Sequence, residues 1–206
     1  MSDERLSRIY ASQGADELAE RYDEWAAEYD DDLAELQYTA PDAGAEGCHR
    51  WAGSGAAVLD AGCGTGLVGR RLHELGVGRL VGFDLSAAML GVAASLGIYD
   101  ELAQGSLLEP LPFAARSFDA VVSVGVFTFG HVGPEALLPL VGLVRGGGHV
   151  TMTFRDDVMR DMGFAAEVER LEREDVWSLV ERTEPAPLIV EDGVGAPMRV
   201  WTWRVP

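Results

Sequence analysis

Short apolar runs alternate along this chain with segments in which apolar residues recur every three or four positions. Runs of the first kind predict buried strands, and segments of the second kind predict amphipathic helices. The expected strands span residues 56–62, 79–85, 101–106, 118–126 and 147–155. The expected helices span residues 67–76, 86–97, 134–145 and 164–175. Alternation of this kind favours a parallel sheet wound on both faces by right-handed crossovers.

The C-terminal part of the chain departs from this alternation. PLIVED (187–192) and PMRVWTWRV (197–205) are β-rich and predict an antiparallel hairpin joined through residues 193–197. With strands numbered in chain order, we expect a doubly wound, Rossmann-like α/β sheet of order 3-2-1-4-5-7-6. Ligands of such sheets bind at the carboxyl ends of the strands, where the winding reverses. We therefore expect the site at the ends of the first and fourth strands.

Ahead of the sheet, residues 15–37 form an acidic segment with helical periodicity. Its apolar and aromatic positions are Leu18, Tyr22, Trp25, Tyr29 and Leu36. One interpretation is an amphipathic helix packed on the domain; the other is a lid over the site, formed by residues 1–37. Residues 38–55 are rich in Gly, Ala and Pro and predict a linker. We thus expect a single domain over residues 1–206, with a Rossmann-like core at 56–206.

Charge narrows the classes of ligand. The 206 residues carry a formal net charge of −18, from 34 acidic and 16 basic residues, and every basic residue is Arg. The absence of Lys excludes Schiff-base chemistry, and the acidic field opposes nucleic acid and anionic membranes. We expect a small, neutral or cationic substrate. The charged start, MSDERLSRIY, and the lack of a long apolar run favour a cytoplasmic protein.

Cysteine usage gives no sign of a metal or a disulfide. Cys48 and Cys63 are the two cysteines, and their spacing matches no zinc motif. We expect no metal site.

The stretch VLDAGCGTG (58–66) follows the first predicted strand and places a carboxylate, Asp60, in a glycine-rich turn. Turns of this kind usually bind phosphates, but a pyrophosphate beside Asp60 would be repelled. The dinucleotide fingerprint also fails, because Leu67 stands where its third glycine should be. Either Asp60 is turned away and structural, or the ligand is cationic there. S-adenosylmethionine carries both an ammonium and a sulfonium.

A second carboxylate, Asp84, ends the second predicted strand about twenty residues beyond the glycines. An acidic side chain at this position can accept hydrogen bonds from both ribose hydroxyls. Proteins that bind dinucleotides use the same position, so Asp84 distinguishes S-adenosylmethionine from a dinucleotide only together with Asp60. Ser86 follows and is placed to cap the next helix.

In order and spacing, VLDAGCGTG, VGFDLSAAML, AQGSL and SFDAVVSVGV resemble the motifs of class I S-adenosylmethionine-dependent methyltransferases. With YDEWAAEYDDDL and GVFTFGHVGPEAL, the chain is similar to the Williams-Beuren-syndrome-region methyltransferase-like proteins. The resemblance implies the cofactor S-adenosylmethionine and the fold above. Ser106 departs from the Asp that many members have. The expected cofactor-binding residues are Asp60, Gly62, Cys63, Gly64, Gly66, Asp84, Leu85, Ser86, Met89, Gly105, Ser106, Leu107 and Ser123, with Tyr22, Trp25 and Tyr29 from the lid.

The segment VFTFGHV (126–132) follows the fourth strand and lies at the predicted crevice. We expect Phe127 and Phe129 to contact the substrate. His131 is either structural, an orienting residue or a general base that deprotonates the nucleophile. Methyl transfer needs alignment and no covalent enzyme nucleophile, which fits the lack of a Ser/His/Asp or Cys/His pattern.

We therefore expect a metal-free methyltransferase that acts on oxygen or nitrogen of a small molecule. Two motifs that would indicate other acceptors are missing. SVGVF lacks the Asn/Asp-Pro-Pro-aromatic motif of amine and nucleobase methyltransferases, and no acidic pair suited to magnesium follows the fourth strand. The alternatives are a non-catalytic S-adenosylmethionine-binding protein and an NAD(P)-dependent oxidoreductase.

Overall fold

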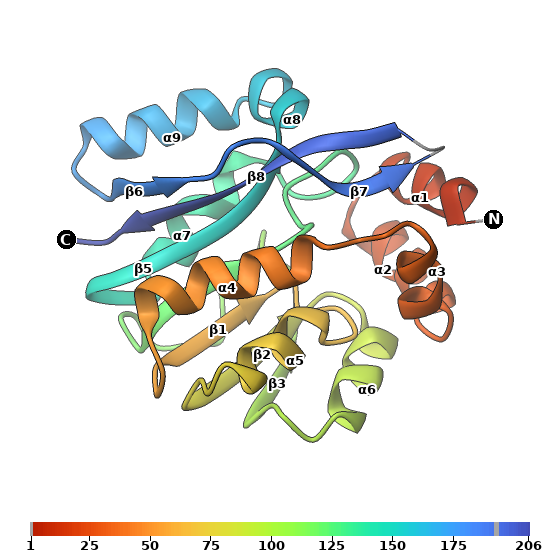
Figure 1. Cartoon of the computed structure of the whole chain (residues 1–206), viewed down its shortest axis with the longest axis horizontal. Helices are drawn as coiled ribbons and strands as arrows, with labels where there is room; N and C mark the ends of the chain where they lie inside the picture. The colour runs from red at the N-terminus through yellow and green to blue at the C-terminus, as the bar shows by residue number, and fades with distance from the viewer. Residues whose placement is uncertain (1, 192–193) are drawn as a thin grey trace.

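The computed structural model describes residues 2–191 and 194–206, and in this part of the chain eight strands form one sheet (Figure 1). The strands follow the order β3-β2-β1-β4-β5-β8-β6, with β7 also paired to β8. Strands β1 to β5 pair in parallel, and β8 runs antiparallel to β5, β6 and β7. The strands are β1 (Ala57–Ala61), β2 (Arg79–Asp84), β3 (Glu101–Gln104), β4 (Phe118–Ser123), β5 (Val144–Arg155), β6 (Ser178–Arg182), β7 (Ala186–Glu191) and β8 (Val194–Arg204).

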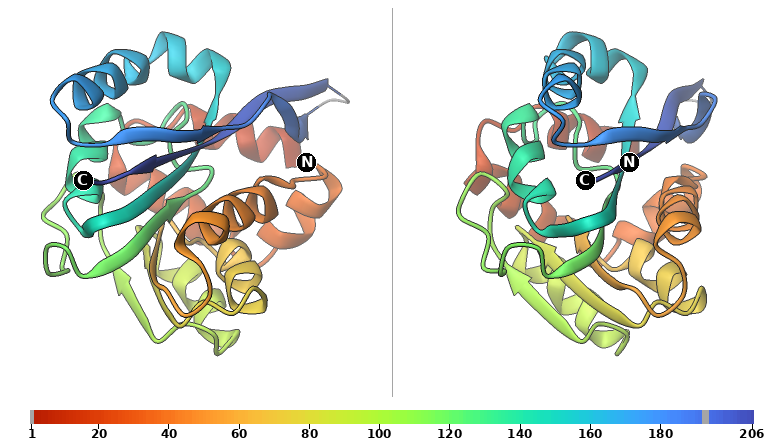
Figure 2. Two further views of the ribbon diagram at one scale, coloured as in Figure 1. Left: turned by 60° about the vertical axis from the view of Figure 1, so that its left-hand side comes forward. Right: turned by 90° about the vertical axis from the view of Figure 1, so that its left-hand side faces the viewer.

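Helices cover both faces of this sheet (Figure 2). They are α1 (Ser2–Tyr10), α2 (Ala15–Trp25), α3 (Tyr29–Glu35), α4 (Ala40–Ala52), α5 (Leu67–Glu74), α6 (Ala87–Ser95), the short 3-10 helix η1 (Pro134–Ala136), α7 (Leu137–Val141), α8 (Asp156–Asp161) and α9 (Phe164–Arg173). Among the described residues, no helix combines the length and the apolarity that crossing a membrane would require.

The predicted Rossmann-like fold is confirmed, with its last strand placed beside the fifth. Two details differ. Two strands, β6 and β7, pair with β8 at the edge of the sheet, and β6 was not predicted. The hairpin turn expected at residues 193–197 is also wrong in part, since β8 already begins at Val194; residue 193 lies outside the described residues. The helix expected at 134–145 ends at Val141, and β5 begins at Val144.

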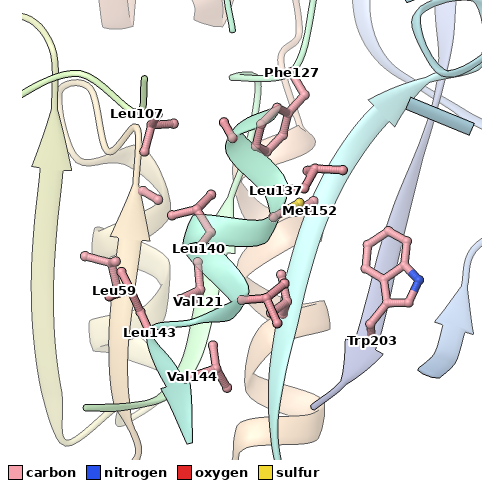
Figure 3. Close-up of a cluster of buried hydrophobic side chains, with 14 of the residues drawn as sticks. Leu59, Leu107, Val121, Phe127, Leu137, Leu140, Leu143, Val144, Met152 and Trp203 are labelled. Carbon is pink, nitrogen blue, oxygen red and sulfur yellow. The ribbon is translucent and has the colours of Figure 1, made fainter. Parts of the chain in front are cut away.

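Alternate residues of the central strands face opposite sides of the sheet. Leu59 of β1 and Val121 of β4 pack in one buried cluster with Leu140 of α7 (Figure 3). Their neighbours Val58 and Ala120 belong to a second cluster, which includes residues of α4 and α5. Because successive side chains of a strand point to opposite faces, a continuous apolar run is what a sheet covered on both faces requires.

Residues 38–55 are not the expected linker: most of them form helix α4, which packs against β4, β5 and α5. Its glycines give the reason. A Cβ at Gly44 would lie 2.3 Å from Cγ2 of Val124, and one at Gly47 would lie 2.9 Å from Cγ1 of Val200. The small residues that suggested a flexible segment therefore let the helix approach the sheet closely.

The N-terminal segment forms three helices, and the helical segment expected over 15–37 consists of two of them, α2 and α3. They lie together at one end of the sheet (Figure 1). Leu18, Trp25, Leu33 and Leu36 are buried there with residues of the sheet domain, in the cluster that contains Met198. The apolar stripe thus packs on the domain, as an amphipathic helix would.

Candidate active site

The glycine-rich turn between β1 and α5 has a backbone that only glycine adopts easily. Gly62, Gly64 and Gly66 have φ values of 80°, 52° and 95°. A Cβ at Gly62 would also lie only 2.1 Å from Cγ2 of Val126. The Gly62 and Cys63 N–H groups both donate to the Phe83 carbonyl oxygen at 2.7 and 3.1 Å, which fixes the turn to the end of β2.

Asp84, the last residue of β2, faces this turn. Its Oδ2 accepts from the Gly64 N–H at 2.7 Å, and its Oδ1 accepts from the Ser86 N–H at 2.9 Å. Burial raises the pKa of Asp84, while these N–H groups lower it. A carboxylate has about four acceptor sites, so each oxygen keeps the capacity for another hydrogen bond. Asp84 can therefore receive two further donors, such as the vicinal hydroxyls of a ribose.

Asp60 lies fully buried beneath the glycine turn. The Tyr99 hydroxyl donates to its Oδ2 at 2.8 Å, and its Oδ1 has no hydrogen-bond partner among residues 2–191 and 194–206. Burial raises the pKa of Asp60 to about 7, against the effect of the Tyr99 hydrogen bond, which lowers it. Sequence reasoning missed Tyr99, because no local pattern links it to a residue 39 positions earlier.

Above the turn and Asp84 lies a first cavity of about 190 Å³. It brings together many of the residues expected to bind the cofactor: Tyr22, Gly62, Asp84, Leu85, Gly105, Ser106 and Leu107. His131 also lines it. The lining residues that were not expected to contact the cofactor or the substrate are Ser12, Gly14, Ala15, Leu18, Phe83, Leu108, Val126, Gly130 and Val132.

The other expected cofactor residues surround this cavity without lining it. Ser86 caps α6 and accepts from the Met89 N–H, and Met89 is buried. The Ser123 hydroxyl donates to the Ala61 carbonyl oxygen at 2.7 Å. Gly64 holds Asp84, and Gly66 caps α5.

Neither cysteine lines the first cavity. Both are free and buried, and burial raises the pKa of the Cys48 thiol to about 12. Burial likewise raises the pKa of Cys63, which lies in the glycine turn and outside the lining of the first cavity. Within the part of the chain that the structure describes, no group of three or more His, Cys, Asp or Glu could hold a metal ion.

A second cavity, of about 50 Å³, lies beneath the N-terminal helices. Trp25 and Tyr29 line it and not the first cavity, so the aromatic stripe faces two compartments. Phe127, one of the two expected substrate contacts, lines this second cavity. Phe129, the other, lines neither cavity, and its ring centroid lies 5.9 Å from the Arg155 guanidinium carbon. Further aromatic walls come from Tyr10, Tyr22 and Tyr38.

Tyr22 and His131 line both cavities and are hydrogen-bonded to each other. Tyr22 Oη lies 2.8 Å from His131 Nε2, and His131 Nδ1 lies 2.9 Å from the Phe129 carbonyl oxygen. A carbonyl only accepts, so Nδ1 carries the hydrogen, and Nε2 accepts the Tyr22 proton. Burial lowers the pKa of His131 and raises that of Tyr22, so the pair is neutral near pH 7.

Acidic side chains fasten the N-terminal helices to the turns around the first cavity. Asp23 Oδ1 accepts from the Ser86 hydroxyl and from the Ala88 N–H at the start of α6. Asp30 Oδ1 accepts from the Thr65 hydroxyl at 2.6 Å, within the glycine turn. The helices that wall the site are thus tied to the turns that shape it.

Comparison with known proteins agrees with this geometry. A family model described as a methyltransferase domain matches residues 58–148. Human methyltransferase-like protein 27 is 36% identical over 182 residues, covering 83% of this chain and 74% of the relative. A yeast (Saccharomyces cerevisiae) 18S rRNA (guanine(1575)-N(7))-methyltransferase is 37% identical over 67 residues, which are 32% of this chain and 24% of that enzyme.

Among solved structures, a TehB-like SAM-dependent methyltransferase from Corynebacterium glutamicum superposes with a TM-score of 0.67 at 21% identity. The match covers 91% of this chain and 99% of that one. The likeness at this identity concerns the fold, and the human relative carries the assignment of the family. The chain belongs to the class I S-adenosylmethionine-dependent methyltransferases related to methyltransferase-like protein 27, and S-adenosylmethionine is its cofactor.

Proposed function

We propose that this methyltransferase transfers a methyl group to an oxygen or nitrogen of a small molecule held in the second cavity. The observation that carries this proposal is the arrangement of the cavities. The aromatic cavity beneath α1–α3 meets the first cavity at Tyr22 and His131, which line both. An acceptor in the second cavity would therefore approach a cofactor in the first across this shared wall.

The residues around the first cavity fit S-adenosylmethionine. Asp84 keeps one acceptor site on each oxygen for the ribose hydroxyls, beside the turn that Gly64 forms. Asp60 lies beneath the turn and outside the lining of the first cavity, with one oxygen unpartnered in the described chain. In its ionised form it would supply negative charge toward the cationic methionine end. Apolar groups suited to the adenine are Phe83, Leu85 and Leu107.

The bound cofactor supplies a methyl group already activated by a sulfonium, so the protein has to align the acceptor and exclude water. The aromatic side chains are suited to both tasks. Tyr22, Trp25 and Tyr29 pack on one another with ring centroids 4.8 to 6.4 Å apart and form a rigid apolar wall. Their faces would also attract a cation, by about 0.5–2 kcal/mol.

Size and charge favour a small acceptor over a macromolecular one. The second cavity is about 50 Å³ and is covered by three helices, so a folded RNA or protein cannot enter it as a whole. A cavity that binds benzene has about 150 Å³, so α1–α3 have to move outward for a small aromatic acceptor to enter. The net charge of −18 opposes nucleic acid. The rRNA methyltransferase from yeast shares only 67 aligned residues with this chain, so its acceptor does not carry over.

The test is turnover of the full-length protein with S-adenosylmethionine and a panel of small phenols, amines and carboxylates. We expect S-adenosylhomocysteine to form with at least one small molecule and not with total RNA. Asp84→Ala should abolish the signal at subsaturating cofactor, whereas Glu169→Ala, which removes an exposed carboxylate on α9, should leave it unchanged. Turnover with RNA alone would refute the small-molecule acceptor.

A further inference from the structure

The wall between the two cavities is built around a single hydrogen bond with a defined direction. Tyr22 donates to His131 Nε2, because His131 Nδ1–H is engaged by the Phe129 carbonyl oxygen. The Tyr22 oxygen keeps its own lone pairs, and its residue lines both cavities. An acceptor in the second cavity would thus meet the Tyr22 hydroxyl oxygen, whose proton already points at the neutral His131 imidazole.

A second polar group in the aromatic cavity lacks a partner. The Thr128 hydroxyl is buried, Thr128 lines the second cavity, and its Oγ1 has no hydrogen-bond partner within the described residues. A buried hydroxyl without a partner is costly, since it has lost its hydration. The Thr128 hydroxyl could therefore form a hydrogen bond with a polar group of a ligand in this otherwise apolar cavity.

We infer that Tyr22 and His131 form a proton relay for an acceptor that binds in the second cavity with a polar group on the Thr128 hydroxyl. This inference rests on the proposed function. The acceptor's own O–H or N–H donates to Tyr22 Oη, which donates to His131 Nε2. Tyr22 is therefore a catalytic residue that touches the acceptor, and His131 acts through it.

In this relay, the acceptor loses one proton for each methyl group that it gains. As the acceptor atom forms its bond to the methyl carbon, the carbon–sulfur bond breaks and its electron pair stays on sulfur. The acceptor's proton passes to Tyr22 Oη, and the Tyr22 proton passes to His131 Nε2. The cationic charge thus moves from the sulfonium to the imidazolium, which later releases its proton to water.

The side chains that line the second cavity indicate which class of acceptor it could bind. The aromatic rings favour a flat apolar body. A phenol oxygen can donate its proton to Tyr22 Oη and at the same time accept a hydrogen bond from the unpartnered Thr128 hydroxyl, so a phenol-like O–H fits both groups. Arg155 also lines the cavity, but Asp157 binds it through two hydrogen bonds of 2.9 and 3.1 Å, so its charge is largely compensated. The acceptor is accordingly a small, planar, neutral phenol-type molecule.

The experiment uses p-cresol as the probe and its O-methyl ether, 4-methylanisole, as the matched compound without the proton. Both are titrated into the full-length protein saturated with S-adenosylhomocysteine. We expect p-cresol to bind about tenfold more tightly than the ether, and Thr128→Val to weaken p-cresol about fivefold, since each comparison removes one hydrogen bond. Equal binding of the two compounds, or no binding of p-cresol at millimolar concentration, would overturn the acceptor class.

The relay itself has a spectroscopic readout in the ¹⁵N resonances of the histidines. The chain has four His, and His131→Gln identifies the resonances of His131. We expect p-cresol to shift the Nε2 resonance in the wild type, and Tyr22→Phe to shift it without probe and to remove the response to p-cresol. The other titratable groups that line the two cavities are Tyr10, Tyr29, Tyr38, Asp84 and Arg155.

Glu169→Ala is the comparison variant, because it removes an exposed carboxylate of α9 that lines neither cavity. It should keep the p-cresol response of His131. An unchanged response in Tyr22→Phe would overturn the relay while p-cresol still binds. Failure of the proposed function would look different: no small molecule in the panel would be methylated, whatever the His131 resonance does.

Discussion

Asp84 lies where the end of β2 meets the glycine turn, and its free acceptor sites are suited to the ribose. Replacing it by Ala removes hydrogen bonds to a charged group, so we expect cofactor affinity to fall by about 1.5–3 kcal/mol. Calorimetric titration with S-adenosylmethionine measures this loss. Glu169→Ala, with an exposed carboxylate on α9, is the control for the change in net charge. Unchanged affinity in Asp84→Ala would remove Asp84 from the binding site.

Asp60 should make the folded protein less stable as pH rises, whereas an Asp with a lowered pKa in the folded state has the opposite effect. Burial raises its pKa to about 7 in the folded state, against about 3.9 for an unfolded Asp. The folded protein therefore holds this proton more tightly, and its contribution to the free energy of unfolding falls as pH rises from about 4 to about 7. Relative to Asp60→Asn, we expect the cofactor-free wild type to lose about 1–3 kcal/mol between pH 5 and pH 8.

Urea unfolding of both proteins at the two pH values measures this difference, and comparing them cancels the titration of all other groups. The Asn amide oxygen can still accept from Tyr99, so the variant changes mainly the charge. A stability gap that is the same at pH 5 and pH 8 would show that Asp60 does not titrate in this range.

Helix α4 shows how a glycine can serve packing at the scale of one element. Gly44 faces Val124, where a Cβ would lie 2.3 Å from Cγ2, whereas a Cβ at Gly91 in α6 meets nothing within 4 Å. Ala favours a helix by about 1 kcal/mol over Gly. We expect Gly91→Ala to stabilise the protein by about 0.5–1 kcal/mol and Gly44→Ala to destabilise it by about 1–3 kcal/mol, because overpacking outweighs propensity. Chemical denaturation compares the two; equal effects would mean that α4 can shift away from the sheet.

At the scale of the whole molecule, helices α1–α3 connect the two cavities to the turns beneath them. Asp23 and Asp30 hold the starts of α6 and α5 to α2 and α3. A cofactor in the first cavity would contact the α2 segment near Leu18. We expect S-adenosylhomocysteine to slow hydrogen exchange of amides in residues 4–36, and Asp30→Ala to reduce this protection.

Exchange in α9, none of whose residues lines the first cavity, is the internal reference and should not change with ligand. If residues 4–36 are equally protected with and without S-adenosylhomocysteine while the turn at Gly64 gains protection, these helices are a fixed part of the core. Protection that depends on the ligand would support the proposal of a lid.

Features that depend on residues close together in the chain could be predicted from the sequence. Largely apolar runs such as AVLDA predicted the strands, because most positions of a strand covered on both faces are apolar. The cap of α6 by Ser86 depends on residues three positions apart. Asp60 in the glycine turn and Asp84 at the next strand end, together with the order of the motifs, indicated the class of cofactor, since each motif is contained in a short stretch.

Only the tertiary structure decided the features that join distant segments. The chain from 38 to 55 has a linker's composition, yet Gly44 and Gly47 let it pack as a helix, because close contact with β4 and β8 outweighs the weak helix propensity of glycine. The bond between Tyr22 and His131 joins residues 109 positions apart, so no local pattern could reveal it. Folding brings such groups together through the packing of whole elements, and for this reason the second cavity was not visible in the sequence.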